Sequence, residues 1–273
     1  MTITERPMTR VRRPDALPGP RPFGLVRHSL ALARRSVIKT IRTPEQLLDV
    51  TLQPLIFLVM FVYLLGGAVS GSTQEYLQFL LPAIMVQTVM FAGMATGVNL
   101  NTDMAKGVFD RFRSLPIARA APLIGSVVGD LIRYLVAITS LLAFGALLGF
   151  RIGTNPLSAA LACVLTIVFA FSVSWIFVLL GTMMREPSGV QGVAFMTMFP
   201  LTFGTSMMAP RETLPGWLQA WVDVNPVSHV MAASRALMVG GPLGTEALWT
   251  LGWSALIIAV FAPLAVRAYR RKT

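Results

Sequence analysis

Six long apolar stretches along the 273-residue chain constrain its fold more than any other feature of the sequence. A helix needs about 20 predominantly apolar residues to cross the hydrocarbon core of a membrane. With 55% hydrophobic and only 13% charged residues, the composition also lies outside that of soluble domains. The stretches are Leu48–Val69, Leu77–Thr102, Ile124–Phe150, Leu157–Met183, Val190–Ala209 and Ala247–Val266. We therefore predict an all-α, polytopic membrane protein with six transmembrane helices.

Two charged residues, Asp130 and Arg133, lie in the first turns of the third stretch. A charge at the centre of a membrane-spanning helix costs about 2.5–3.5 kcal/mol on the insertion scale. We therefore expect both residues to lie near the lipid headgroups, and we predict that no charged residue lies centrally in any span.

The positive charges predict the orientation of the chain in the cell membrane. All but three of the 23 Lys and Arg residues fall in the N-terminal tail, the 103–133 segment, the turn at Arg185 and the C-terminal tail. Cytoplasmic flanks retain positive charge, so both termini should be cytoplasmic. This topology, together with contacts to anionic membrane lipids, accounts for the net charge of +11 without a nucleic-acid partner.

The N-terminal tail divides into two parts. Residues 1–22 are rich in Pro and Arg, lack the apolar core of a secretory signal and predict a disordered basic tail. Residues 23–43 carry apolar side chains at helical spacing, with basic residues on another face. This pattern predicts an amphipathic helix at the membrane interface, which either anchors the chain in lipid or also transmits motion to the first span.

Sequence motifs for a metal, a disulfide or a nucleotide are missing. The chain has one cysteine, Cys163, and two histidines, His28 and His229, which do not form a metal-binding pattern. A P-loop requires Gly-Lys followed by Ser or Thr, and none of the three lysines follows a glycine. We predict that this chain binds no cofactor, and that any ATP used for transport is bound by another polypeptide.

The loop at 103–123 combines charged residues with bulky apolar ones. Its centre reads Asp-Arg-Phe-Arg-Ser-Leu-Pro-Ile from Asp110, and Pro116 should end or restart a helix there. A short helix with aromatic and leucine side chains and an arginine rim is suited to a protein contact.

Three segments carry a resemblance to a known family. They are Lys106–Asp130 around the loop, the run Leu-Pro-Gly-Trp-Leu-Gln-Ala-Trp from Leu214 with Asn-Pro-Val-Ser-His from Asn225, and Ala236–Pro242. Together they resemble type-2 ABC exporter permeases, most closely the daunorubicin-resistance subgroup. The similarity covers the chain from about Phe23 to its C-terminus, so residues 23–273 would form one permease domain.

The resemblance implies a permease subunit that moves amphipathic drug, antibiotic or lipid-like molecules out of the cell. In that family two permease copies, identical or related, pair with two separate ATP-binding subunits that bind ATP and Mg. A cytoplasmic coupling helix receives their motion; Asp110–Leu115 would fill the groove of the ATPase, with Arg113 and Arg119 at its rim. Lys106 replaces an acidic residue that is common in the family. The implied ATPase-coupling residues are Asp110, Arg111, Phe112, Arg113, Ser114, Leu115, Pro116 and Arg119.

The segment between Ala209 and Ala247 is too polar for a simple span and is divided by four prolines. Trp217 and Trp221 are four residues apart, as interfacial aromatic residues on one helix face would be. We predict two short, partly re-entrant helices on the external side, between the fifth and sixth spans. They would form either an exit gate or a belt at the membrane surface.

Small and polar residues recur in the second and fifth stretches. In the second, Thr88 and Asn99 belong to a stripe that indicates either close helix packing or a wall facing substrate. Methionine and threonine residues in the fifth would give adaptable contacts to bulky cargo, and Pro200 and Gly204 would let this helix bend. The candidate pathway residues are Thr88, Asn99, Met198, Thr202, Thr205 and Met207.

Three other functions compete with an ABC permease. A non-ABC secondary transporter should carry ionisable groups near the membrane midplane, and the spans do not predict any there. An intramembrane serine hydrolase would use Ser206 and His229, but Met208 replaces the second glycine of a nucleophile elbow and no acid is evident. A passive scaffold would leave the loop pattern unexplained. We predict a chain that is not itself catalytic.

Overall fold

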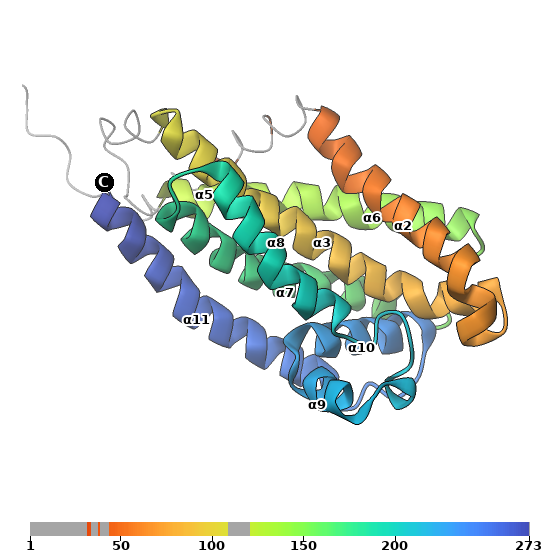
Figure 1. Ribbon diagram of the computed structural model, residues 1–273. Coiled ribbons are helices and arrows are strands. Elements are labelled where there is room, and N and C mark those ends of the chain that lie inside the picture. Colours follow the sequence, from red (N-terminus) through yellow and green to blue (C-terminus); the bar gives the residue numbers. More distant parts are fainter. Residues whose placement is uncertain (1–31, 34–37, 39–43, 109–120, 273) are drawn as a thin grey trace, which may run out of the picture.

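The computed structural model describes residues 32–33, 38, 44–108 and 121–272 of the protein (Figure 1). These residues form helices and no strands, which confirms the all-α prediction for the part described. The basic tail at 1–22 and the centre of the coupling loop at 109–120 lie outside it. Of the interfacial helix predicted at 23–43, only residues 32, 33 and 38 are described, and all three are helical.

Six long helical passages and a small outer subdomain make up the described chain. The bounds are α2 Pro44–Ser70, α3 Thr73–Ala105, α5 Ala121–Gly129, α6 Leu131–Leu147, α7 Pro156–Met183, α8 Pro187–Phe203, the 3₁₀ helix η1 Arg211–Thr213, α9 Gly216–Val224, α10 Pro226–Val239 and α11 Glu246–Lys272. The outer subdomain consists of η1, α9 and α10, between α8 and α11.

Helix α3 is the centre of the bundle. It packs against α2, α6, α7, α8 and α10, and 78% of its most apolar stretch is buried. For α2 and α11 the buried fractions are only 17% and 22%, because these helices cover the outside. Without water in the hydrocarbon, apolar side chains on such outer faces are stable in contact with lipid.

Two glycines bring α3 and α7 into backbone contact. A Cβ added at Gly97 would lie 2.3 Å from the carbonyl oxygen of Phe177, and one added at Gly181 would lie 2.4 Å from the carbonyl oxygen of Gly97. One turn further along, the Asn101 side-chain amide donates to the carbonyl of Gly181 at 2.8 Å. Small residues with an interhelical hydrogen bond are typical of tightly packed membrane helices.

Short capped turns connect helices at one end of the bundle. Between α2 and α3, Gly71 has a φ of 76° and the Ser72 hydroxyl caps α3 by accepting from the Glu75 amide at 3.1 Å. Asn155 caps α7 by accepting from the Ser158 amide at 2.7 Å. These two turns lie at the same end as α9 and α10, whereas the C-terminal end of α11 and the start of α5 lie at the other (Figure 1).

The helix bounds agree with most of the predicted stretches. Five helical segments among the described residues are long and apolar enough to cross a membrane: Thr51–Ser70, Thr73–Ala105, Leu123–Leu147, Pro156–Met183 and Glu246–Arg271. The fifth predicted stretch, Val190–Ala209, is not among them, because α8 has only 17 residues and ends at Phe203. Five of the six predicted spans therefore correspond to a helix that could cross a membrane, and the count of six is not confirmed.

The end of α8 has a clear packing cause. The amide of Gly204 still donates to the carbonyl of Pro200, but a Cβ at Gly204 would lie 2.7 Å from Nε1 of Trp221. Asn225 then donates from its side-chain amide to the carbonyls of Leu201 and Gly204, at 2.9 and 3.2 Å. These contacts hold the end of α8 against α9 and the start of α10.

Candidate functional site

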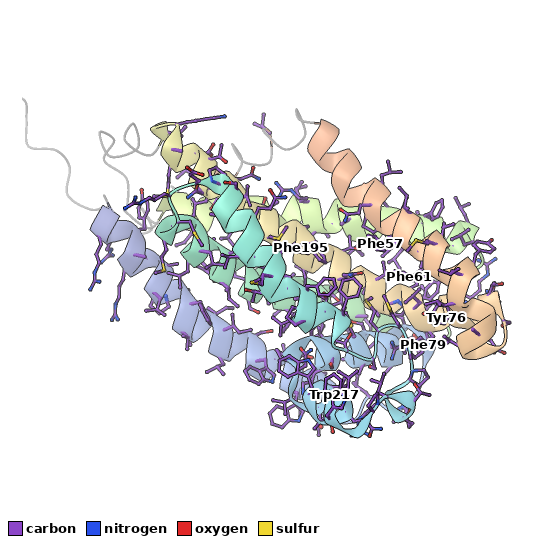
Figure 2. All side chains as sticks on the ribbon, in the orientation of Figure 1. Phe57, Phe61, Tyr76, Phe79, Phe195 and Trp217 are labelled. Atoms are coloured by element: carbon purple, nitrogen blue, oxygen red, sulfur yellow. The ribbon has the colours of Figure 1, made fainter. Side chains whose placement is uncertain are left out.

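A mainly apolar groove, with five phenylalanines among its twelve lining residues, separates α2 from α8 over the surface of α3. It encloses about 360 Å³. Figure 2 labels Phe57 on α2 and Phe195 on α8, which lie on opposite sides of this groove. The lining residues are Gln53, Pro54, Phe57, Gln87, Thr88, Phe91, Ala92, Met94, Ala95, Phe195, Phe199 and Phe203.

Helical spacing produces the aromatic wall. Phe195, Phe199 and Phe203 are four residues apart, so they share one face of α8, and their adjacent ring centroids are 5.9 and 4.7 Å apart. On α3, Phe91 extends this row, with its ring 6.2 Å from that of Phe195. Aromatic pairs at these separations attract one another and offer large, flat apolar surfaces. The groove is therefore suited to a planar or amphipathic molecule.

The predicted pathway residues occupy different environments. Thr88 lines the groove, and its hydroxyl donates to the carbonyl of Ile84 at 2.7 Å. Asn99 is half-buried on α3 and is not one of the lining residues. Met198 and Met207 are fully buried in the core.

The two remaining pathway candidates, Thr202 and Thr205, are buried as well. Their hydroxyls donate to the backbone carbonyls of Met198 and Thr202, at 2.8 and 2.6 Å. The structure thus brings one of the six residues to this groove. The phenylalanines on α8 were not among the predicted pathway residues, although their four-residue spacing in the sequence indicates a common helix face.

A buried polar cluster joins α3 to the junction between α5 and α6. Arg133 Nη2 lies 3.2 Å from Asp130 Oδ1, and the Thr96 hydroxyl donates to Asp130 Oδ2. Asp130 and Arg133 are only 3% and 2% exposed, within the candidate span Leu123–Leu147. We expected both near the headgroups; the structure shows in addition that protein surrounds both side chains. The two side chains are three residues apart on one helical turn, so their opposite charges compensate one another. Helix α3 adds hydrogen bonds to both through Thr96 and the carbonyl of Ala92.

The polar cluster also reaches the groove. Arg133 Nη1 donates to the carbonyl of Ala92 at 3.4 Å, and Ala92 is one of the residues that line the groove. The same residue of α3 therefore contacts both the cluster and the groove.

The outer subdomain holds one arginine–carboxylate ion pair and one contact between a histidine and a carboxylate. Arg211 Nε and Nη2 donate to the two carboxylate oxygens of Asp223 at 2.6 and 2.5 Å, which ties η1 to α9. The hydrogen bonds from Arg211 lower the pKa of the Asp223 carboxyl, and Asp223 in turn raises the pKa of Arg211. His229 Nδ1 lies 2.6 Å from Glu246 Oε2, joining α10 to the start of α11, and its ring stacks on Trp249.

The hydrolase alternative loses its geometric basis in this subdomain. Glu246 does supply an acid beside His229, which the sequence alone did not indicate because the two residues are 17 apart. However, no hydrogen bond joins the Ser206 hydroxyl to His229, although both residues are described. The backbone carbonyl of Ser206 instead accepts from Arg235 Nη2 at 3.1 Å.

The predicted external tryptophans are exposed, as surface aromatic residues would be. Trp217 and Trp221 on α9 are 74% and 43% exposed, although Trp221 also covers Gly204. The predicted ATPase-coupling residues from Asp110 to Arg119 lie outside the described residues. Among the described residues, no group of three His, Cys, Asp or Glu side chains is arranged to hold a metal.

Comparison with known proteins gives a consistent set of similarities. The model of the ABC-2 type transporter family matches residues 27–239. The daunorubicin resistance ABC transporter permease protein DrrB1 of Streptomyces coeruleorubidus is 50% identical over 233 residues, covering 84% of this chain and 81% of that protein. The probable doxorubicin resistance permease DrrC of Mycobacterium tuberculosis is 26% identical over 262 residues, 94% of each chain. The putative transport permease ycf38 of Cyanophora paradoxa is 25% identical over 219 residues, covering 79% of this chain and 75% of that one.

Proposed function

The chain belongs to the ABC-2 type transporter family, and from this premise we propose that it is the permease subunit of an ABC drug exporter whose cargo passes along the groove between α2 and α8. The groove carries the proposal. Its aromatic walls and few polar groups, chiefly Gln53, Gln87 and Thr88, match the apolar rings and scattered polar substituents of an amphipathic drug. The remaining predicted pathway residues would act behind this wall, supporting α8 as it moves.

In this proposal the permease domain comprises residues 23–273 and crosses the membrane six times. Helix α8 would be the fifth crossing in chain order and would complete the six, because its 17 residues span about 26 Å and the chain continues to Ala209. Arg267, Arg270 and Arg271 lie at the C-terminal end of α11, and positive charge favours the cytoplasm. Both termini would then be cytoplasmic, and α9 and α10 would form the re-entrant helices on the outside of the cell membrane.

The coupling loop would receive the work of ATP hydrolysis from a partner. The chain has no P-loop, so ATP and Mg would bind to a separate ATPase subunit. The segment Asp110–Leu115 would enter the ATPase groove, with Pro116 ending the coupling helix and Arg119 at its rim. The relatives named DrrB and DrrC are both permeases, which supports pairing with a second permease, identical or related.

The buried polar cluster offers a route from this loop to the groove. Helix α5 begins at Ala121, directly after the loop, and ends at Gly129, next to Asp130. A displacement of α5 would move Asp130 and Arg133, and Arg133 holds the carbonyl of Ala92 on the groove-lining helix. Pairs of buried charges transmit displacement because separating them is costly.

The experiment is drug export by membrane vesicles that contain the permease and its ATPase, with ATP added and the groove altered. Phe199→Ala removes a ring that packs between Phe195 and Phe203, and should lower the export rate for a planar drug about tenfold. Tyr63→Ala is the matched control, since Tyr63 is an aromatic residue on α2 that is 66% exposed and does not line the groove. Equal export by both variants would contradict the assignment of the groove, and ATP-independent export would contradict the ABC mechanism.

A further inference from the structure

A second cavity lies in the outer subdomain, away from the aromatic groove. It encloses about 260 Å³ where the external end of α3 meets α10, near the segment that follows α8. Phe79, labelled in Figure 2, forms its inner wall on α3. The lining residues are Phe79, Ser206, Pro210, Arg211, Glu212, Val222, Asp223, Ser228, His229, Ala232, Arg235 and Glu246.

Arg235 gives this cavity a buried positive charge. Its guanidinium carbon lies 3.7 Å from the centroid of the Phe79 ring, Nε donates to the carbonyl of Phe79 at 3.0 Å and Nη2 donates to the carbonyl of Ser206 at 3.1 Å. Both acceptors are neutral carbonyls, and no carboxylate of the described residues lies within 4 Å of the guanidinium. A guanidinium has five N–H donors and stays protonated in proteins, so several donors remain available.

Ser228 adds an unused polar group to the same wall. It is 4% exposed, lines the cavity, and its hydroxyl has no hydrogen-bond partner among the described residues. Ser228, Ala232 and Arg235 are spaced by four and three residues, so they share one face of α10. Side chains on a helix lean toward its N-terminus, and the guanidinium of Arg235 therefore extends toward Ala232 and Ser228.

Two of the three carboxylates around the cavity already have a hydrogen-bond partner within the subdomain. Arg211 is paired with Asp223, and His229 with Glu246. Glu212 is exposed at the rim, where water screens its charge. The guanidinium of Arg235 makes its hydrogen bonds to neutral carbonyls only, and the Ser228 hydroxyl has no hydrogen-bond partner among the described residues. A buried charge is stable only when a counter-charge or sufficient hydrogen bonds satisfy it.

We propose that this cavity is a binding site for one oxyanion group, a phosphate or a carboxylate, held by the guanidinium of Arg235 and the hydroxyl of Ser228. Its oxygens accept from both donors, while the Phe79 ring and the two carbonyls fix the guanidinium in place. Such a group comes either from a free anion or from the headgroup of a membrane phospholipid. The site lies apart from the aromatic groove, so it does not depend on the route of the cargo.

The test measures thermal unfolding of the full chain in two arms. In uncharged detergent, inorganic phosphate or acetate is titrated against chloride at equal ionic strength. In the other arm the protein is reconstituted in vesicles of phosphatidylcholine with or without phosphatidylglycerol. A rise in the midpoint with free phosphate or acetate identifies a small-anion site, and a rise only with phosphatidylglycerol identifies a headgroup site. Absence of a rise in both arms overturns the proposal.

Three variants make the response specific. Ser228→Ala should weaken the response about tenfold in ligand concentration, because it removes one donor to a charged acceptor. Ala232→Asp places a carboxylate between the two donors and should abolish the response without preventing folding. Ser234→Ala is the matched control, since its hydroxyl lies 3.1 Å from that of Thr166 on α7 and does not line the cavity. A wild-type response in Ser228→Ala or Ala232→Asp would overturn the proposal even if anions stabilise the protein.

Discussion

Replacing Gly97 with alanine should destabilise the bundle at the backbone contact between α3 and α7. The new Cβ would lie 2.3 Å from the carbonyl oxygen and 2.8 Å from the carbonyl carbon of Phe177. A carbon and a carbonyl oxygen approach comfortably only to about 3.3 Å, so α3 and α7 would have to separate by about 1 Å. A Cβ is fixed to the backbone and cannot rotate away, and therefore the helices themselves must move.

The magnitude follows from three effects. Overpacking of a close contact costs about 1–3 kcal/mol. The same movement would lengthen the 2.8 Å bond from Asn101 to Gly181 beyond hydrogen-bonding distance, at a further cost of about 1 kcal/mol. Alanine is favoured over glycine within a helix by about 1 kcal/mol, which offsets part of the loss. We expect a net destabilisation of about 1–3 kcal/mol.

The assay is equilibrium unfolding in mixed micelles with increasing SDS, followed by circular dichroism. Gly252→Ala on α11 is the control, because a Cβ there has no atom within 4 Å and the substitution should be neutral or slightly stabilising. Gly181→Ala tests the same contact from the opposite helix and should resemble Gly97→Ala. If Gly97→Ala unfolded at the same SDS fraction as Gly252→Ala, the backbone contact would not limit the stability of the bundle.

Three further predictions test other parts of the molecule. Asp130→Asn removes the carboxylate 3.2 Å from the Arg133 guanidinium and should lower the free energy of unfolding by about 3–5 kcal/mol, measured by thermal unfolding. The double variant Asp130→Leu with Arg133→Met should regain much of that stability but not ATP-driven export. Full export by the double variant would exclude the cluster from coupling. Leu115→Asp should abolish copurification of the ATPase without changing the helical content, and an intact complex would contradict the position of the coupling helix. Because pairing with Arg211 lowers the pKa of Asp223, it stabilises the outer subdomain above pH 3.8, and this effect is lost as pH falls through the lower pKa of the folded state. Tryptophan fluorescence of the wild type should therefore change below about pH 4. An identical change in Asp223→Asn would refute this cause.

Several features of the site could be predicted only in part. The spacing of Phe195, Phe199 and Phe203 is visible in the sequence, yet it does not reveal that α2 leaves that face uncovered. Thr88 was identified from its stripe on α3, whereas Gly97, which permits backbone contact with α7, belongs to a different face of the same helix. Periodicity identifies the faces of a helix, but the neighbour of each face is a tertiary property.

The buried charges illustrate the same limit. A charge inside a span costs free energy, so the sequence led us to expect Asp130 and Arg133 near the headgroups. The structure buries both, because Thr96 and the carbonyl of Ala92 come from a helix more than 30 residues away and complete their hydrogen bonds. A compensating partner at that separation leaves no local pattern in a single sequence.

The sequence by itself determined that the chain forms apolar helices, where the turns cap them, and that no P-loop is present. Those properties depend on residues within one or two helical turns, and caps such as Asn155 before Pro156 act locally. Only the tertiary structure decided that α8 ends at Gly204, that α2 and α8 enclose a groove, and that Arg235 faces a cavity with Ser228. Each of these depends on contacts between different helices, and packing geometry rather than local preference selects them.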